Sequence, residues 1–405
     1  MSFRERSEDI LEPRVIIAGV GMNCSDSMTI RAINAAESAD ILIGAGRILR
    51  GFEYLHKESF CSYNACEIAD HICINPRKKI VALMSGDCGF FSGAKKLSEE
   101  LDRRGICYEI IPGIASPVYL CARLGIGWDR LRFVSMHGAE ANIVREVCSN
   151  EYVFVLLGGE KDFSEVCRKL TEYGRGKVSV FLGENLGYPE EKITKGLAEE
   201  FSGVTTSKLC SVIIVNREYE KYLASGIPDD EFIRGKAPMT KAEIRCSAVS
   251  KLNIGESDIC WDIGSGTGSV SVEMALRCPG GKVYAVEKDE ETAELSEKNF
   301  RKFGCDNVIS VCGRAEDVME KLPVPDCVFI GGSGGRLSEI VSAALGKNPS
   351  VRIVMTAVSL ETLAESECLG EREITQISAA RTVKAGRYTM LRGENPVFVI
   401  RRLPL

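Results

Sequence analysis

The sequence lacks the features that mark secreted, membrane-spanning and metal-binding proteins. No apolar run approaches the roughly 18 residues of a membrane span, and the charged residues 1–14 contain no apolar core of a signal peptide. Histidine occurs only three times, and no two of the 17 cysteines form a CxxC pair. We therefore expect a cytoplasmic protein with no metal site and no membrane contact, whose cysteines are mostly reduced core residues.

An excess of one charge is also missing. The net charge is −6 over 405 residues, and residues 1–225 and 226–405 each contribute −3. Without a basic half or tail, binding of nucleic acid through many phosphate contacts is disfavoured. The hydrophobic fraction of 45% is that of a globular protein, and at about 150 residues per domain the length predicts two to three domains.

Short apolar runs alternate with helical patterns along the whole chain, which indicates an α/β fold. In the first half such runs lie at 15–20, 41–43, 80–84, 108–111, 133–135, 152–157, 178–182 and 209–215. A polar, turn-rich stretch at 224–231 follows. The rhythm then restarts, with strands predicted at 258–263, 282–286, 308–311, 327–330 and 351–357. We predict two domains, 1–223 with two α/β lobes and 224–405 with a Rossmann-like doubly wound sheet.

The most specific motif is the loop Trp261–Gly268, in which a strand runs into three alternate glycines before a helix opens near Ser269. Glu287 follows at the end of the next strand, where a carboxylate can accept both hydroxyls of a ribose. Dinucleotides usually require GxGxxG, whereas this loop suits S-adenosylmethionine; a turn without any ligand is the third reading. The predicted cofactor-binding residues here are Asp262, Gly264, Ser265, Gly266, Thr267, Gly268, Glu287 and Gly313. Asp262 would hold the loop or contact the donor's amino group.

The stretch Phe329–Gly335 stands where nucleic-acid amino methyltransferases commonly carry an Asn/Asp-Pro-Pro-aromatic motif. Its glycines favour a bulky substrate, and their N–H groups can face carboxylates. Upstream, residues 236–245 predict a segment that folds over the donor. Lys241 and Arg245 are the predicted substrate-orienting cations, although a solvated face is the alternative.

Residues 227–400 resemble the decarboxylating precorrin methyltransferases of cobalamin biosynthesis. The resemblance rests on the ordered stretches 226–231, 239–245, 262–268, 313–316 and 329–335. It implies that Thr240 and Ala315 also line the methyl donor, S-adenosylmethionine.

In the first half, four glycine loops follow apolar strands, at 19–21, 85–91, 111–116 and 156–159. Single glycine turns are often structural, but loops at the ends of neighbouring strands can converge on one crevice. Their order resembles the tetrapyrrole methyltransferase family over residues 13–217, which implies donor contacts from Gly19, Gly21, Gly86, Asp87, Ile114, Ala115 and Ser116. The loops depart from the family pattern at Met22 and Cys88. His137 is a candidate contact for a substrate carboxylate.

Together the two halves resemble fused precorrin methyltransferases. The resemblance implies methylation of a precorrin or cobalt-precorrin at C5 by the first domain, and at C15 with decarboxylation of the C12 acetate by the second. It also implies a homo-oligomer, with any cobalt arriving in the substrate. The alternative from another class is an RNA methyltransferase.

Overall fold

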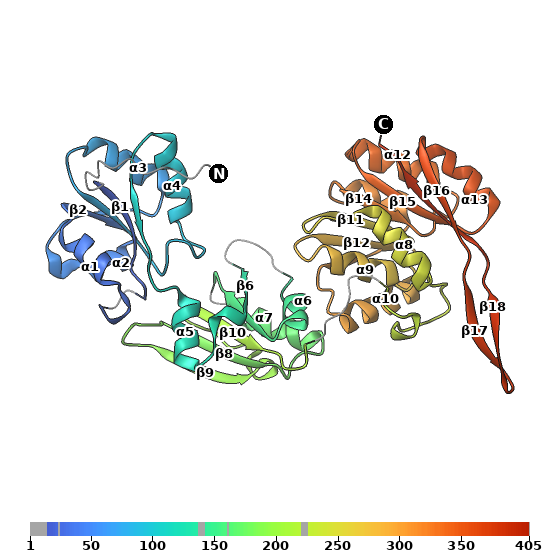
Figure 1. Ribbon diagram of the computed structural model, residues 1–405, viewed down its shortest axis with the longest axis horizontal. Helices are drawn as coiled ribbons and strands as arrows, with labels where there is room; N and C mark the ends of the chain where they lie inside the picture. The colour runs from blue at the N-terminus through green and yellow to red at the C-terminus, as the bar shows by residue number, and fades with distance from the viewer. Residues whose placement is uncertain (1–13, 23–24, 137–141, 160–161, 220–225, 405) are drawn as a thin grey trace.

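The computed structural model describes residues 14–22, 25–136, 142–159, 162–219 and 226–404. Three units, each built on its own sheet, follow one another along the longest axis of the molecule (Figure 1). The first two units form the N-terminal half and the third the C-terminal half. The α/β fold class is confirmed, and the linker predicted near residue 224 lies partly outside the described residues.

The first lobe is a five-stranded parallel sheet in the order β3-β2-β4-β1-β5. Helices cover both faces, so the central strands are apolar throughout and buried. Its elements are β1 (Val15–Gly19), α1 (Ile30–Glu37), β2 (Ile41–Gly44), α2 (Gly46–Arg50), β3 (Glu58–Cys61), α3 (Ala65–Ile74), β4 (Ile80–Met84), α4 (Ala94–Arg103) and β5 (Glu109–Ile111).

The second lobe is a mixed sheet in the order β6-β7-β10-β8-β9, parallel only between β6 and β7. Alternate residues of β7 point to opposite faces, with Val153 and Val155 towards α6 and α7, and Phe154 towards α5. Its elements are α5 (Ser116–Leu124), β6 (Leu131–Ser135), α6 (Ile143–Ser149), β7 (Tyr152–Leu156), α7 (Asp162–Glu172), β8 (Ser179–Glu184), β9 (Lys192–Leu197) and β10 (Cys210–Val215).

The C-terminal unit is a seven-stranded sheet in the order β13-β12-β11-β14-β15-β19-β16, whose first five strands are parallel. Its strands are β11 (Ile259–Ile263), β12 (Lys282–Glu287), β13 (Val308–Cys312), β14 (Cys327–Ile330), β15 (Arg352–Ala357), β16 (Arg372–Ile377) and β19 (Val397–Arg402). The helices are α8 (Ala242–Leu252), α9 (Ser269–Arg277), α10 (Glu290–Lys302), α11 (Ala315–Val318), α12 (Leu337–Lys347) and α13 (Leu360–Glu365). The strand order reverses between β11 and β14, which is where open α/β sheets bind their ligands.

A two-stranded hairpin, β17 (Ala380–Ala385) and β18 (Tyr388–Gly393), projects from this sheet between β16 and β19 (Figure 1). Neither strand buries a face, so the alternation that marks a half-buried strand is missing. The sequence patterns missed this hairpin and also β16 and β19, whereas they located the five parallel strands to within a residue or two.

The two halves touch through α6 and α7 of the second lobe. The Asp306 side chain, from the turn before β13, is fully buried and accepts hydrogen bonds from the Val144 and Arg145 N–H groups, both at 3.2 Å. Lys169 Nζ lies 2.9 Å from the same carboxylate. Gly304, at a φ of 62°, allows close approach, because a Cβ there would lie 2.6 Å from the Cys148 sulfur. This contact lies at the amino ends of the C-terminal strands.

Candidate active sites

The larger cavity, about 820 Å³, lies at the carboxyl ends of β11 to β15 in the C-terminal unit. Loops after these parallel strands meet at one edge of the sheet, on the opposite side from the contact with the second lobe. The cavity wall includes the predicted residues Thr240, Lys241, Gly264, Ser265, Gly266, Thr267, Glu287, Gly313 and Ala315. It also includes residues that sequence reasoning did not single out: Lys288, Arg314, Arg336, Ile377, Ala379, Glu394 and Asn395.

The glycine loop after β11 needs glycine for its backbone shape and for close packing. Gly264 and Gly266 have φ values of 72° and 55°, a region that disfavours other residues. A Cβ on Gly264 would lie 2.7 Å from the Gly332 carbonyl oxygen, so the loops after β11 and β14 are pressed together. The loop therefore brings its backbone up to the floor of the cavity.

Glu287 fixes this loop from the end of β12. One carboxylate oxygen accepts a hydrogen bond from the Gly266 N–H at 3.0 Å, and the other accepts from the N–H groups of Lys288 and Asp289. A carboxylate has about four acceptor positions, so acceptor capacity remains for a ligand. The buried hydroxyls of Ser265 and Thr267, both in the cavity wall, have no hydrogen-bond partner among the residues that the structure describes. These polar groups and the cavity fit S-adenosylmethionine.

Two predicted residues of this motif do not reach the cavity. Asp262 is fully buried, and one of its oxygens accepts a hydrogen bond from Ser271. Burial raises the pKa of Asp262 to about 7. Gly268 is needed for packing, because a Cβ there would lie 2.5 Å from the Phe300 ring. Gly268 therefore serves packing, and of the two roles predicted for Asp262, holding the loop or contacting the donor, its burial and its bond to Ser271 on α9 favour the first.

The other side of the cavity is formed by the glycine platform, residues Gly331–Gly334 after β14, together with Arg336. Gly331 is crowded, because a Cβ there would lie 3.1 Å from the Gly264 carbonyl oxygen. A Cβ on Gly332 would have no neighbour within 4 Å, and its φ is not in the left-handed region. Nothing in the surrounding protein requires glycine at 332, which leaves the space above it for a ligand.

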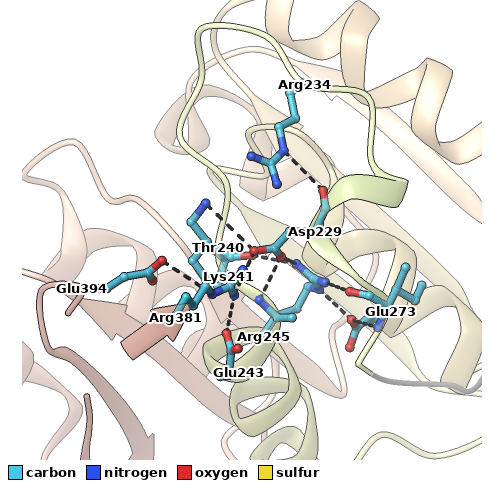
Figure 2. Close-up of polar contacts among 11 residues, drawn as sticks. Asp229, Arg234, Thr240, Lys241, Glu243, Arg245, Glu273, Arg381 and Glu394 are labelled. Carbon is cyan, nitrogen blue, oxygen red and sulfur yellow. Dashed lines mark hydrogen bonds and ion pairs between the residues drawn. The ribbon is translucent and has the colours of Figure 1, made fainter. Parts of the chain in front are cut away.

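Arg245 is not a substrate contact, contrary to the sequence prediction. Its side chain is fully buried and does not line the cavity. Figure 2 shows its guanidinium among carboxylates and carbonyls: Glu273 at 2.6 Å, Asp229 at 3.3 Å, the Thr240 carbonyl at 2.7 Å and the Ile227 carbonyl. The Phe232 ring covers it at 4.7 Å. Arg245 therefore fixes the cavity lid, residues 237–241, through the Thr240 carbonyl.

Lys241 does line the cavity. Its side chain is 38% exposed, and its ammonium lies 4.0 Å from Asp229. The sequence predicted the same role for Lys241 and Arg245 because both are cations in the predicted donor-covering segment 236–245. They differ because the Lys241 side chain is partly exposed and the Arg245 side chain is buried in the core, which the sequence alone did not distinguish.

The smaller cleft, about 300 Å³, lies between the two lobes of the N-terminal half. Four of its predicted residues line it: Gly86, Asp87, Ala115 and Ser116. Asp87 joins two loops, accepting hydrogen bonds from the N–H groups of Gly89 at 2.8 Å and Gly113 at 2.9 Å. Sequence reasoning missed Arg47, whose guanidinium crosses the cleft to the Tyr188 hydroxyl of the second lobe.

Gly19, Gly21 and Ile114 are not among the residues that line this cleft, and their role as donor contacts stays a prediction. A Cβ on Gly19 would lie 2.7 Å from the Gly113 nitrogen, and Gly21, at a φ of 58°, forms a bridge with Gly86. These two glycines let the loops after β1, β4 and β5 pack together. The close packing of these loops is therefore sufficient to explain glycine at both positions.

The two departures from the family pattern have different surroundings. Both side chains are buried, but Met22 lines the cleft, whereas the Cys88 sulfur lies 3.5 Å from the Ile111 carbonyl oxygen. Burial raises the pKa of Cys88 to about 12, so its thiol is neutral. His137 lies outside the described residues.

Within the described ranges, no group of three or more His, Cys, Asp or Glu side chains is arranged to hold a metal ion. In the same part of the chain no helix has the length and apolar character needed to cross a bilayer.

Two family models match the chain, one on each half. Residues 14–202 match the tetrapyrrole (corrin/porphyrin) methylases, and residues 231–402 match the precorrin methyltransferase domain. Both matches fall within the limits of the two predicted domains.

Relatives of the C-terminal half include two archaeal proteins, each named as a probable cobalt-precorrin-6B C(15)-methyltransferase (decarboxylating). The Pyrobaculum calidifontis protein is 46% identical over 187 residues, which are 44% of this chain and 96% of the relative. The Methanothermobacter thermautotrophicus protein is 38% identical, over 43% of this chain and 94% of the relative. A crystal structure described as precorrin-6y C5,15-methyltransferase from Geobacter metallireducens is 36% identical, with a TM-score of 0.43, covering 46% of this chain and all of that one.

Proposed function

The chain belongs to the precorrin methyltransferase family, and we propose that it methylates one corrin precursor at two carbons. In this proposal residues 224–405 methylate C15 and remove the C12 acetate carboxylate as carbon dioxide, and residues 1–223 methylate C5. The substrate is a precorrin or its cobalt complex, and the methyl donor is S-adenosylmethionine.

The observation that carries the proposal is the division of the C-terminal cavity into two sides. The loops after β11, β12 and β13 supply polar groups and backbone suited to S-adenosylmethionine. The opposite side is the glycine platform, where the open space over Gly332 suits a large flat ring. A donor on one side and a macrocycle on the other is what methyl transfer requires.

Bound S-adenosylmethionine supplies an electrophilic methyl group on a sulfonium. Glu287 would hold the ribose, and Ser265, Thr267 and the lid at Thr240 would hold the rest of the donor. The chain's own contribution is position and exclusion of water, since pyrrole-conjugated ring carbons are nucleophilic without a strong protein base.

Lys241, Arg314 and Arg336 would orient the acetate and propionate groups of the ring. All three line the cavity, and guanidinium groups bind carboxylates with two parallel hydrogen bonds. We propose this substrate-orienting role for these three cations and no longer for Arg245. On decarboxylation, the electrons of the broken carbon–carbon bond would enter the conjugated ring, so the substrate is its own electron sink.

In the N-terminal half, Gly86, Asp87, Ala115 and Ser116 would contact the donor, with Arg47 beside it as a cation for a substrate carboxylate. Arg47 and Tyr188 come from different lobes, so the pair would also set how far the cleft opens. We further propose that the protein is cytoplasmic and forms a homo-oligomer. Light scattering of the purified chain would test the oligomeric state.

The RNA methyltransferase alternative gains no support. Both family models and the two archaeal relatives are named for tetrapyrroles or precorrins.

The test is to incubate the full chain with S-adenosylmethionine and either metal-free or cobalt-bound precorrin-6B, and to measure product masses. We expect two methyl additions and the loss of one carbon dioxide from one of the two rings. Loss of carbon dioxide with only one methyl addition would refute the role of the N-terminal half. No mass change on either ring would refute the proposal as a whole.

A further inference from the structure

The base of the projecting hairpin forms part of the wall on the substrate side of the C-terminal cavity. β16 leads into the hairpin and β19 leads out, and Ile377, Ala379, Glu394 and Asn395 line the cavity between them. The Glu394 N–H donates to the Ala379 carbonyl at 2.9 Å, which closes the base of the ribbon. The position of this wall therefore depends on how the ribbon is held.

Arg381, the second residue of β17, joins this wall to the elements that carry the lid. Its guanidinium lies 2.6 Å from Glu243 on α8 and 3.1 Å from Asp229, and 3.6 Å from Glu394 on the other side of the ribbon (Figure 2). The Glu243 pKa lies below its usual range because a backbone N–H and Arg381 both bond the carboxylate. One side chain thus connects the hairpin, α8 and the segment before the lid.

The two sides of this connection differ in how firmly they are held. Asp229 is buried, and it also accepts hydrogen bonds from Arg245 and from the Ala242 N–H at 3.0 Å. By contrast, the strands of the hairpin are almost entirely exposed, and an isolated two-stranded ribbon is marginally stable in water. Arg381 therefore anchors a weakly supported wall to a rigid point.

We propose that Arg381 is a positioning residue that sets the distance between the hairpin base and the lid, and thereby the width of the substrate side of the cavity. The inference rests on the proposed function of this cavity. Arg381 does not line the cavity itself, so it acts through Glu394 in the hairpin wall and Glu243 on α8, which both do. On the donor side, Glu287 holds the glycine loop and Arg245 holds the lid through Thr240; Arg245 shares Asp229 with Arg381 but keeps its own bonds to Glu273 and Thr240.

The test compares Arg381→Ala with Arg387→Ala in the full chain. Arg387 lies at the tip of the same hairpin and bonds the neighbouring Tyr388 hydroxyl. For Arg381→Ala we expect the KM for the precorrin-6B ring accepted by the wild type to rise about tenfold. S-adenosylmethionine affinity, measured by calorimetry, should stay within about twofold of the wild type. Arg387→Ala should match the wild type in both. Light scattering checks that each variant keeps the wild-type oligomeric state.

Arg381→Lys provides a milder variant that keeps the charge. A single ammonium cannot bridge Glu243, Asp229 and Glu394 in the way a planar guanidinium does, so we expect an intermediate rise in KM. An unchanged KM in both Arg381 variants would overturn the inference, and so would an equal loss of donor affinity. If the wild type transfers no methyl group, the proposed function itself fails, which is a separate result.

Discussion

The two catalytic halves of this chain build their sites in different ways. The C-terminal cavity of about 820 Å³ lies at one edge of one sheet, and its donor side comes from loops after three neighbouring strands. The N-terminal cleft of about 300 Å³ lies between two sheets, and its lining is drawn from loops between Met22 and Ser211. The residues of the C-terminal cavity are therefore positioned by a single sheet, whereas the N-terminal cleft depends on how two lobes pack together.

This difference explains what holds each site. In the C-terminal half, Glu287 and the buried Arg245 fix the glycine loop and the lid through hydrogen bonds within one unit. In the N-terminal half, Arg47 and Tyr188 make a contact across the cleft from different lobes, and the Phe90 ring of the first lobe packs against Phe133 and Phe154 of the second. The C-terminal site is therefore held by contacts within one unit, whereas the N-terminal site includes a contact between two lobes.

The strongest way to separate the halves is to disable each site alone. Glu287→Ala removes a hydrogen bond to the glycine loop and, in the proposed function, those to the donor, so we expect C15 methylation to fall on the order of a hundredfold. Ala115→Trp fills the inter-lobe cleft and should abolish C5 methylation instead. Product masses with the full chain would measure both. If either variant stopped both methylations equally, the assignment of one reaction to each half would be wrong.

The glycine platform gives a sharper test of the substrate side. Gly332→Leu places a side chain in open space over the platform, where we expect the substrate KM to rise about tenfold or more while donor affinity is retained. Gly346→Leu is the matched control, because Gly346 is exposed on α12 and its Cβ would also have no neighbour within 4 Å. Equal kinetics for the two leucine variants would contradict a ring bound at Gly332.

The buried Asp262 predicts a pH dependence specific to the C-terminal half. Its pKa of about 7 exceeds the ordinary value of 3.8. At a pH between these two values, Asp262 therefore holds a proton in the folded state that it has lost in the unfolded state. Its contribution therefore favours folding at low pH and declines as pH rises, by about 2 kcal/mol between pH 5 and 7.5. Asp262→Asn should remove that slope in chemical denaturation.

The control for this measurement is Asp289→Asn at the start of α10. The Thr292 hydroxyl and N–H lower the Asp289 pKa, so its contribution is complete above pH 5 and is lost only in more acidic solution. Its variant should keep the wild-type slope between pH 5 and 7.5. The same slope in the wild type and Asp262→Asn would contradict the pKa assigned to Asp262.

The smallest effect on catalysis is expected at the contact between the halves. Asp306→Ala removes the acceptor shared by Lys169 and the first N–H groups of α6, so the halves should unfold in two calorimetric transitions where the wild type has one. Both methylations should stay within about twofold, because neither cavity includes this contact. A large loss of either methylation would mean that the contact shapes a site.

The sequence predicted most reliably what a single short segment determines. The loop Trp261–Gly268 and Glu287 lie as the strand–turn–helix pattern required. The sequence could not predict which residues of a motif face the ligand. Gly19, Gly21 and Gly268 belong to the glycine motifs, yet each is required for close packing. Nor could it separate Arg245 from Lys241, because the partners of Arg245, Asp229 and Glu273, are brought to it only by folding. The hairpin escaped prediction because it buries no face.

The most direct test of the central claim is to follow both methyl groups into one product. The full chain would be supplied with S-adenosylmethionine labelled with carbon-13 in its methyl group and with the accepted precorrin-6B ring, and the product examined by NMR. We predict two labelled methyl signals on the same ring, at C5 and C15, and no acetate carboxylate at C12. A product labelled at one carbon only would contradict the account of two working sites on this chain.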